Sequence, residues 1–167
     1  MKISGKIYYM PKNKFDDINT DEILSGPFMR IPEEQLPEHA FEGIIPNFKE
    51  QIRNKGILIA GKNFGCGSSR EQAPKALIGC GIKAIIAESF GYIFYRNSIN
   101  LGLALIKADK KVISRLETAE EVSLDLVSGS LKADDTQKYN VAPLEGVSIK
   151  ILQYGGLLQY LKENDTF

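Results

Sequence analysis

Cysteine, histidine and tryptophan are scarce in this chain: its 167 residues include two cysteines, one histidine and no tryptophan. Iron–sulfur clusters are held by sets of about four cysteine thiolates, so Cys66 and Cys80 cannot hold one alone. A disulfide between them would be unusual in a reducing cytosol. His39 is distant in sequence from both, which disfavours a cysteine–histidine nucleophile, although only the fold can decide this. The sequence therefore predicts that this chain binds no metal and no cofactor of its own.

Net charge and long apolar runs are also lacking. The 21 basic and 21 acidic residues give a formal net charge of zero, which leaves no electrostatic footprint for nucleic acid. No apolar run approaches the roughly 20 residues that span a membrane, and the first six residues lack a signal-peptide core. We therefore expect a soluble, cytoplasmic protein, with residues 1–167 forming one domain.

The most informative segment is the glycine-rich run Gly61–Glu71, GKNFGCGSSRE. It follows an apolar, strand-like run at 57–60 and leads into a helix-like segment at 70–80. Glycines allow close backbone approach and positive φ, and free N–H groups at a helix start attract anions. Arg70 adds a planar guanidinium that suits a carboxylate. The run therefore predicts a turn that binds a carboxylate.

A purely structural explanation competes with this one, because glycine-rich turns before helices are common and Ser68 or Ser69 would serve equally well as a helix cap. Two nucleotide-binding motifs are excluded. The run lacks the third glycine of a dinucleotide fingerprint, and no Gly–Lys–Ser/Thr closes it as in a P-loop.

Hydrophobic periodicity predicts an α/β fold. An alternating pattern predicts a strand at 2–9, and continuous apolar runs predict buried strands at 57–60, 83–87 and 103–106, with helices at 70–80 and 91–100 between them. Strand–helix–strand order of this kind indicates a βαβ core with parallel strands. We further expect a loop at 16–30, short helices within 32–43 and at 112–116, an appended β-hairpin at 122–132, and helical turns at 149–162 broken at Gly155–Gly156. Cys80, flanked by glycines near a helix end, is expected to be buried.

Residues 61–74, GKNFGCGSSREQAP, closely resemble the active-site loop of the small subunits of aconitase-type hydro-lyases, the isopropylmalate isomerases and homoaconitases. Residues 19–23, 84–102 and 155–157 also resemble blocks of that family, so the resemblance covers most of the chain outside 110–144. It implies a single swivelling β/β/α-type domain that closes over an active site.

The resemblance also implies an activity, a cofactor and a partner. The implied reaction interconverts 2-isopropylmalate and 3-isopropylmalate by dehydration and rehydration, in leucine biosynthesis. The family uses a 4Fe–4S cluster with one open iron as a Lewis acid. In the split enzymes a separate large subunit carries that cluster, and this subunit is the implied partner; self-association of the isolated chain is the alternative assembly.

By the same resemblance, Ser68 corresponds to the serine that takes a proton from substrate as an alkoxide. Arg70 would stabilise that alkoxide and hold a substrate carboxylate. Ser69 would donate a hydrogen bond to the substrate, with helix capping as its alternative role. Asn63 and Cys66 are expected at the substrate side of the turn, where each can instead serve only to shape or pack it.

Arg30 is the remaining candidate, in the segment Gly26–Arg30. In the family this loop lies near the part of the substrate that differs between enzymes. The isopropylmalate isomerases that this chain resembles have Pro–Tyr–Leu–Arg–Thr in this loop, whereas homoaconitases more often have Tyr–Leu–Val–Tyr. Arg30 therefore favours isopropylmalate, while Ile31 departs from that pattern. A surface arginine without a ligand is the alternative.

Three other functions stay open. The chain could be the small subunit of a homoaconitase or of a 2,3-dimethylmalate dehydratase, or a non-catalytic anion-binding module. Asp21, in an Asn–Thr–Asp motif, is expected to organise the loop or to meet the large subunit.

Overall fold

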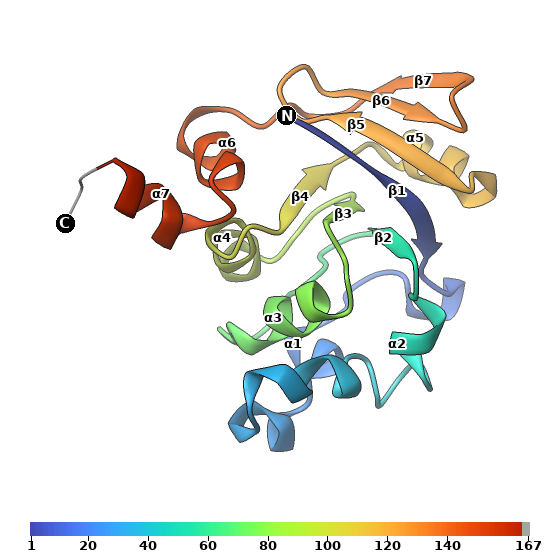
Figure 1. Cartoon of the computed structure of the whole chain (residues 1–167). Coiled ribbons are helices and arrows are strands. Elements are labelled where there is room, and N and C mark those ends of the chain that lie inside the picture. The colour runs from blue at the N-terminus through green and yellow to red at the C-terminus, as the bar shows by residue number, and fades with distance from the viewer. Residues whose placement is uncertain (165–167) are drawn as a thin grey trace.

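A seven-stranded mixed sheet forms the centre of the computed structural model, which describes residues 1–164 (Figure 1). The strands are β1 Lys2–Tyr9, β2 Lys55–Ile59, β3 Ala84–Ala87, β4 Ala104–Lys107, β5 Glu121–Asp125, β6 Ser130–Ala133 and β7 Gln137–Asn140. Their order across the sheet is β4-β3-β2-β1-β5-β6-β7. The first four strands are mutually parallel, and the last three continue the sheet in antiparallel pairing from β1. The predicted α/β class with a parallel βαβ core is confirmed.

The helices divide between the two faces of the sheet. They are α1 Thr20–Ile23, α2 Phe48–Gln51, α3 Gln72–Gly79, α4 Tyr92–Asn100, α5 Lys110–Arg115, α6 Gly146–Gln153 and α7 Leu157–Glu163, with 3₁₀ turns η1 Lys12–Lys14, η2 Gly26–Arg30, η3 Glu33–His39 and η4 Leu116–Thr118. Figure 1 shows α1, α2 and α3 gathered on one side of β2 and β3. No helix among residues 1–164 is long and apolar enough to cross a membrane.

Alternation along the central strands supplies both cores. On β2, Leu58 packs in the cluster beneath α1–α3, whereas Ile57 and Ile59 pack in the opposite cluster. Successive side chains of a strand point to opposite faces, so a strand buried on both faces has a continuous apolar sequence. The runs that predicted β2, β3 and β4 are therefore apolar because helices cover both faces.

The expectation of a loop at 16–30 is wrong, because the segment contains α1 and the 3₁₀ turn η2. Asn19 starts α1 with a capping box: its side chain accepts from the Glu22 N–H at 2.9 Å, and its own N–H donates to the Glu22 carboxylate at 3.0 Å. Burial opposes ionisation of Glu22, but this N–H and the ammonium of Lys14 outweigh it and lower the Glu22 pKa. Side-chain capping of this kind lets a four-residue helix form in a polar, turn-rich sequence.

The predicted hairpin is present as β5 and β6, but it belongs to the main sheet. Ile3 of β1 lies opposite Leu124 of β5, which joins the hairpin to the parallel strands. The strand β7, which the sequence did not predict, pairs with β6 at the sheet edge. Its polar residues, QKYN, lack the apolar alternation that identifies a strand, because this edge strand is mostly exposed.

Cys80 is only partly buried, which corrects the expectation that it is a buried core residue. Its Sγ donates to the carbonyl of Pro37 at 3.4 Å. Burial raises the pKa of this thiol to about 12. Cys80 is therefore a neutral thiol at physiological pH and is unsuited to nucleophilic chemistry.

Candidate active site

The glycine-rich run lies where β2 ends, between β2 and α3, and is bonded to a segment from the beginning of the chain. Gly61 donates its N–H to the Phe15 carbonyl at 2.9 Å, and Gly65 donates to Ile18 at 2.7 Å. In the other direction, Thr20 donates its N–H to the Cys66 carbonyl at 2.8 Å. These three backbone bonds give the loop a fixed shape.

Gly65 is a position in this loop that only glycine fits without strain. Its φ of +75° favours glycine, and a Cβ placed there would lie 2.2 Å from Cγ of Phe94 in α4. The loop thus passes directly over the start of the second βαβ helix. Because Phe94 is a core residue with 2% of its surface exposed, this contact anchors the loop to the interior and leaves residues 67–69 exposed.

Ser68 and Arg70 are in direct contact. The Nε of Arg70 donates to Oγ of Ser68 at 2.9 Å. Neither serine caps the following helix, because α3 begins after Glu71 and has no side-chain cap. The structural alternative for Ser68 and Ser69 is therefore removed, and Ser68 presents an exposed hydroxyl next to a positive charge.

Arg70 is held by three groups of the chain. Besides Ser68, its Nη1 donates to the Leu24 carbonyl at 3.3 Å and forms an ion pair with Asp21. The Arg70 side chain is 18% exposed, whereas the Asp21 side chain is 59% exposed. The two N–H groups of Nη2 have no partner within residues 1–164. The guanidinium, held through Nε and Nη1, thus leaves its Nη2 edge available for an anion.

The other loop candidates occupy different environments. Ser69 is exposed, and its hydroxyl has no hydrogen-bond partner among the described residues. Asn63 has a φ of +56°, and its side-chain amide donates to the Asp17 carboxylate at 2.9 Å, so its side chain holds the turn. Cys66 directs its Sγ at the Asp17 carbonyl at 3.5 Å. Burial and the Asp17 charge raise the pKa of the Cys66 thiol, which disfavours a nucleophilic role.

Arg30 ends η2 and is exposed. No hydrogen bond or ion pair joins it to any residue in the described chain, so the structure does not bring it into contact with Ser68 or Arg70. Nearby, Phe28 stacks on His39 with ring centroids 3.8 Å apart, and His39 also bonds Glu42 through Nδ1 at 2.8 Å. Arg30 thus carries a charge without a hydrogen bond or ion pair in the described chain, two residues after Phe28.

Thr20 and Asp17 are site residues that the sequence reasoning did not commit to. Thr20 is buried and its hydroxyl donates to the Ser68 carbonyl at 3.0 Å. Asp17 has a φ of +55°, a conformation in which aspartate is enriched among non-glycine residues. A signal for the segment was available: Asn19 followed three residues later by Glu22 has the spacing of a capping box. That spacing predicts a helix that starts after Asn19, but it does not predict that this helix contacts Ser68.

The described residues do not form a metal site. No group of three histidine, cysteine, aspartate or glutamate side chains within residues 1–164 is placed to hold an ion. Cys66 and Cys80 are both bonded to backbone carbonyls through protonated thiols. The donor set needed for an iron–sulfur cluster is therefore absent from this part of the chain.

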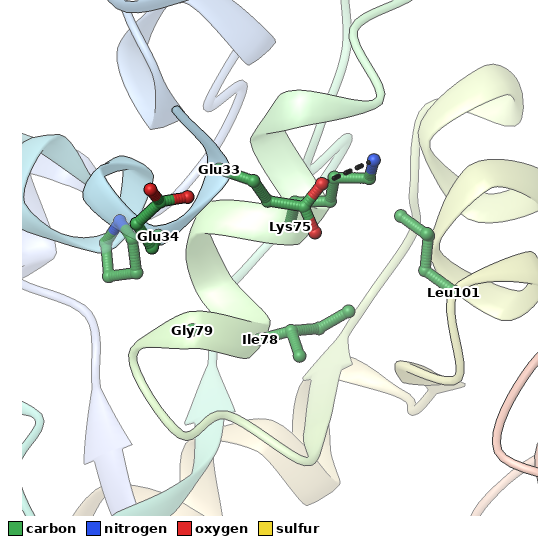
Figure 2. A pocket seen from close by; sticks show the side chains of 7 residues that line it. Glu33, Glu34, Lys75, Ile78, Gly79 and Leu101 are labelled. Atoms are coloured by element: carbon green, nitrogen blue, oxygen red, sulfur yellow. Dashed lines mark hydrogen bonds and ion pairs between the residues drawn. The ribbon is translucent and has the colours of Figure 1, made fainter. Parts of the chain in front are cut away.

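A surface cavity of about 570 Å³ lies along α3 toward its C-terminal end (Figure 2). Lys75, Ile78 and Gly79 of α3 form one wall, and Glu33 of η3 reaches across to Lys75 with an N–O distance of 2.9 Å. None of the six predicted site residues lines this cavity. The predicted site lies instead on the exposed loop that precedes α3, where residues 67–69 face solvent.

The fold and the site together define an α/β domain that places an exposed serine hydroxyl beside an arginine guanidinium. A comparison with protein families matches residues 3–111 to the aconitase C-terminal domain. The chain belongs to this family, and within it to the small subunits of hydro-lyases. The resemblance noted from residues 61–74 is thereby confirmed.

Three relatives illustrate the match. The chain is 46% identical to the methanogen homoaconitase small subunit of Methanothermobacter thermautotrophicus, over 90% of this chain and 88% of that protein. It is 40% identical to 3-isopropylmalate dehydratase small subunit 1 of Archaeoglobus fulgidus, over 88% and 91%. The crystal structure of 3-isopropylmalate dehydratase (LeuD) from Methanocaldococcus jannaschii matches with a TM-score of 0.85 and 38% identity, covering 99% of this chain and 96% of that one.

Proposed function

We propose that this chain is the small subunit of a 3-isopropylmalate dehydratase and interconverts 2-isopropylmalate and 3-isopropylmalate with a large-subunit partner, as a step of leucine biosynthesis. The observation that carries a catalytic role is the 2.9 Å contact between the Arg70 Nε and the Ser68 hydroxyl. A hydroxyl is a poor base in water, and an adjacent guanidinium lowers the cost of its ionised form.

In the proposed reaction Ser68, as the alkoxide, takes a proton from the carbon beside a substrate carboxylate. Hydroxide leaves the neighbouring carbon, which gives the alkene, hydroxide and neutral Ser68. Transfer of the serine proton to the hydroxide then yields water and restores the alkoxide, and rehydration reverses these steps with the two carbons exchanged. Arg70 holds the substrate carboxylate with its free Nη2 edge while its Nε stays on Ser68. Ser69, exposed beside Ser68, donates a hydrogen bond to the substrate. Asn63 and Cys66 shape the turn through their bonds to Asp17.

The partner in this proposal carries a 4Fe–4S cluster, a Lewis acid suited to the departure of hydroxide. Two observations support a separate chain for that role: the described residues lack the thiolates for a cluster, and the Ser68 loop lies exposed. The family relationship also supports it, because the relatives are named as small subunits. Self-association is the alternative assembly for the isolated chain.

A homoaconitase is the second candidate, favoured by the 46% identity to a relative of that name, and Ile31 departs from the isopropylmalate-type pattern. Arg30 is the residue that favours isopropylmalate. It lies in the same segment as the partly buried Phe28 and Ile31, so the segment combines a charge with apolar side chains. Apolar side chains of this kind suit a branched alkyl group, whereas the larger acidic arm of homocitrate would gain little from contact with them.

The isolated chain is expected to be colourless, iron-free and without dehydratase activity, because it lacks ligands for a cluster. Addition of a cluster-bearing large subunit should produce activity on 3-isopropylmalate that exceeds activity on homocitrate. Iron analysis and a spectrophotometric assay of alkene formation with each substrate test both points. Iron bound by an active isolated chain would overturn the two-subunit assignment, and preference for homocitrate would favour the homoaconitase. No activity with any partner would favour an anion-binding module.

Replacement of Arg30 by valine should change substrate choice more than the rate of the chemical step. We expect the ratio of kcat/KM for isopropylmalate over homocitrate to change by about tenfold or more, the scale of a pocket contact. Arg30 contacts no other described side chain through a hydrogen bond or ion pair, so the fold should be unaffected. Steady-state kinetics on both substrates measure the ratio. Equal losses for the two substrates would show that Arg30 does not distinguish them.

A further inference from the structure

Thr20 and Ser98 are the serine and threonine residues that are buried within residues 1–164, with 2% and 0% of their surfaces exposed. Buried hydroxyls normally have a hydrogen-bond partner. The Ser98 hydroxyl has none among the described residues, whereas the Thr20 hydroxyl bonds to the catalytic loop. Of these two aliphatic hydroxyls, only that of Thr20 is therefore bonded to the proposed active-site loop.

The Thr20 hydroxyl lies between two oxygens of Ser68. It donates to the Ser68 carbonyl at 3.0 Å, and it lies 3.5 Å from the Ser68 Oγ. That Oγ already accepts from the Arg70 Nε at 2.9 Å. Ser68 Oγ is thus flanked by a guanidinium donor and by a neutral hydroxyl that comes from a segment 48 residues earlier in the chain.

The position of Thr20 is fixed independently of its hydroxyl. Its backbone N–H donates to the Cys66 carbonyl at 2.8 Å, and the capping box between Asn19 and Glu22 holds the first turn of α1. A Cβ on Gly67 would lie 3.5 Å from the Thr20 Oγ1, which is ordinary contact and shows how closely the loop passes. Removal of the hydroxyl alone should therefore leave the backbone of both segments in place.

We propose that Thr20 is a positioning residue for Ser68, one that orients the serine and strengthens its alkoxide form. The inference rests on the proposed function, in which Ser68 is the base. A hydroxyl has one proton and rotates to suit its acceptors. While Ser68 is neutral, the Thr20 hydroxyl directs that proton at the Ser68 carbonyl in a hydrogen bond. When Ser68 is ionised, its Oγ is the stronger acceptor, because hydrogen bonds to charged groups are roughly twice as strong as neutral ones. Thr20 keeps its own proton throughout.

The test compares Thr20→Val, which keeps the shape and loses the hydroxyl, with Thr20→Ser, which keeps the hydroxyl. In the reconstituted enzyme we expect Thr20→Val to lower kcat by about tenfold or more, the effect of one hydrogen bond to a charged group. The KM for 3-isopropylmalate should stay within about twofold, because Thr20 does not touch the carboxylates. Thr20→Ser should restore most of the lost kcat.

Ser98→Ala is the matched control, because it removes another buried aliphatic hydroxyl, one that has no partner in the described residues. Its kcat should equal that of the wild type. A readout without turnover comes from amide hydrogen exchange of the isolated chain. Exchange at residues 66–70 should be faster in Thr20→Val than in the wild type, and unchanged in Ser98→Ala. If Thr20→Val does not fold, Thr20→Ala must show the same loss of kcat at unchanged KM.

Three results would overturn the inference. Wild-type kcat in Thr20→Val, with Ser68→Ala inactive, would exclude Thr20 as a positioning residue while leaving the proposed function intact. Equal losses in Thr20→Val and Thr20→Ser would show that the methyl group and its packing matter, not the hydroxyl. Full activity of Ser68→Ala would overturn both the proposed function and the role of Thr20.

Discussion

Replacement of Ser68 by alanine should lower kcat of the reconstituted enzyme by about 10²–10⁴-fold, the range for loss of a positioned acid–base group. The Ser68 side chain is exposed and contributes little to the core, so the thermal unfolding midpoint should stay close to that of the wild type. The Arg70 guanidinium, which donates to the Ser68 hydroxyl, keeps its bonds to Leu24 and Asp21. The site should therefore keep its shape and lose only its base. Steady-state kinetics and a thermal melt measure the two quantities.

Ser69→Ala is the matched control for this experiment, because Ser69 is the adjacent serine and is equally exposed. Its hydroxyl makes no hydrogen bond within the described chain, and its predicted role is to bind substrate. Its loss should therefore appear mainly as a higher KM. If Ser68→Ala kept more than about a tenth of the wild-type kcat, well above what removal of a general base allows, the base would lie elsewhere.

The parallel core could be predicted from sequence because its signal is local. Leu58 and Ile59 point to opposite faces and are both fully buried, so the strand is apolar at every position. The same physics explains the failure at β7. An exposed edge strand needs no apolar residues, and its pairing with β6 depends on partners rather than on its own composition.

The loop itself was also predictable, but its surroundings were not. Glycines, serines and an arginine in one short run already indicated an anion-binding turn. The contacts that orient it come from elsewhere: Leu24 meets Arg70 across 46 residues, and Thr20 meets Ser68 across 48. Every residue has a backbone carbonyl, so the residue type of Leu24 gives no sign that its carbonyl accepts a hydrogen bond from Arg70. Only the fold shows that the segment at 19–24, which the sequence indicated as a loop, forms the other side of the site.

These contacts also refine what Arg70 can do. The sequence suggested a planar fork open to a carboxylate, whereas the structure commits Nε to Ser68 and Nη1 to Leu24 and Asp21. One guanidinium thus performs two tasks that require different nitrogens. Planarity matters for this reason: it sets the angle between the edge that meets the base and the edge that is left for a ligand.

Replacement of Arg70 by lysine should therefore impair the enzyme severely even though the charge is retained. A lysine ammonium is a compact point donor, so it cannot bond Ser68, Leu24 and a substrate carboxylate at once. Two hydrogen bonds to charged groups are lost, and at roughly 1.5–3 kcal/mol each we expect kcat/KM to fall at least about a hundredfold. The loss should be similar for isopropylmalate and homocitrate, because Arg70 would hold a carboxylate that both substrates share.

Arg53→Lys is the matched control, because Arg53 lies on the surface with 72% of its side chain exposed and only a 3.7 Å ion pair to Glu50. Exposed pairs of this kind contribute little, so its kinetics should equal those of the wild type. Wild-type kinetics in Arg70→Lys would show that a positive charge alone is enough, and would reduce Arg70 to the ion pair with Asp21. A loss confined to one substrate would instead place Arg70 at the variable end of the ligand, where Arg30 is expected, because a group that holds the shared carboxylate cannot distinguish the two substrates.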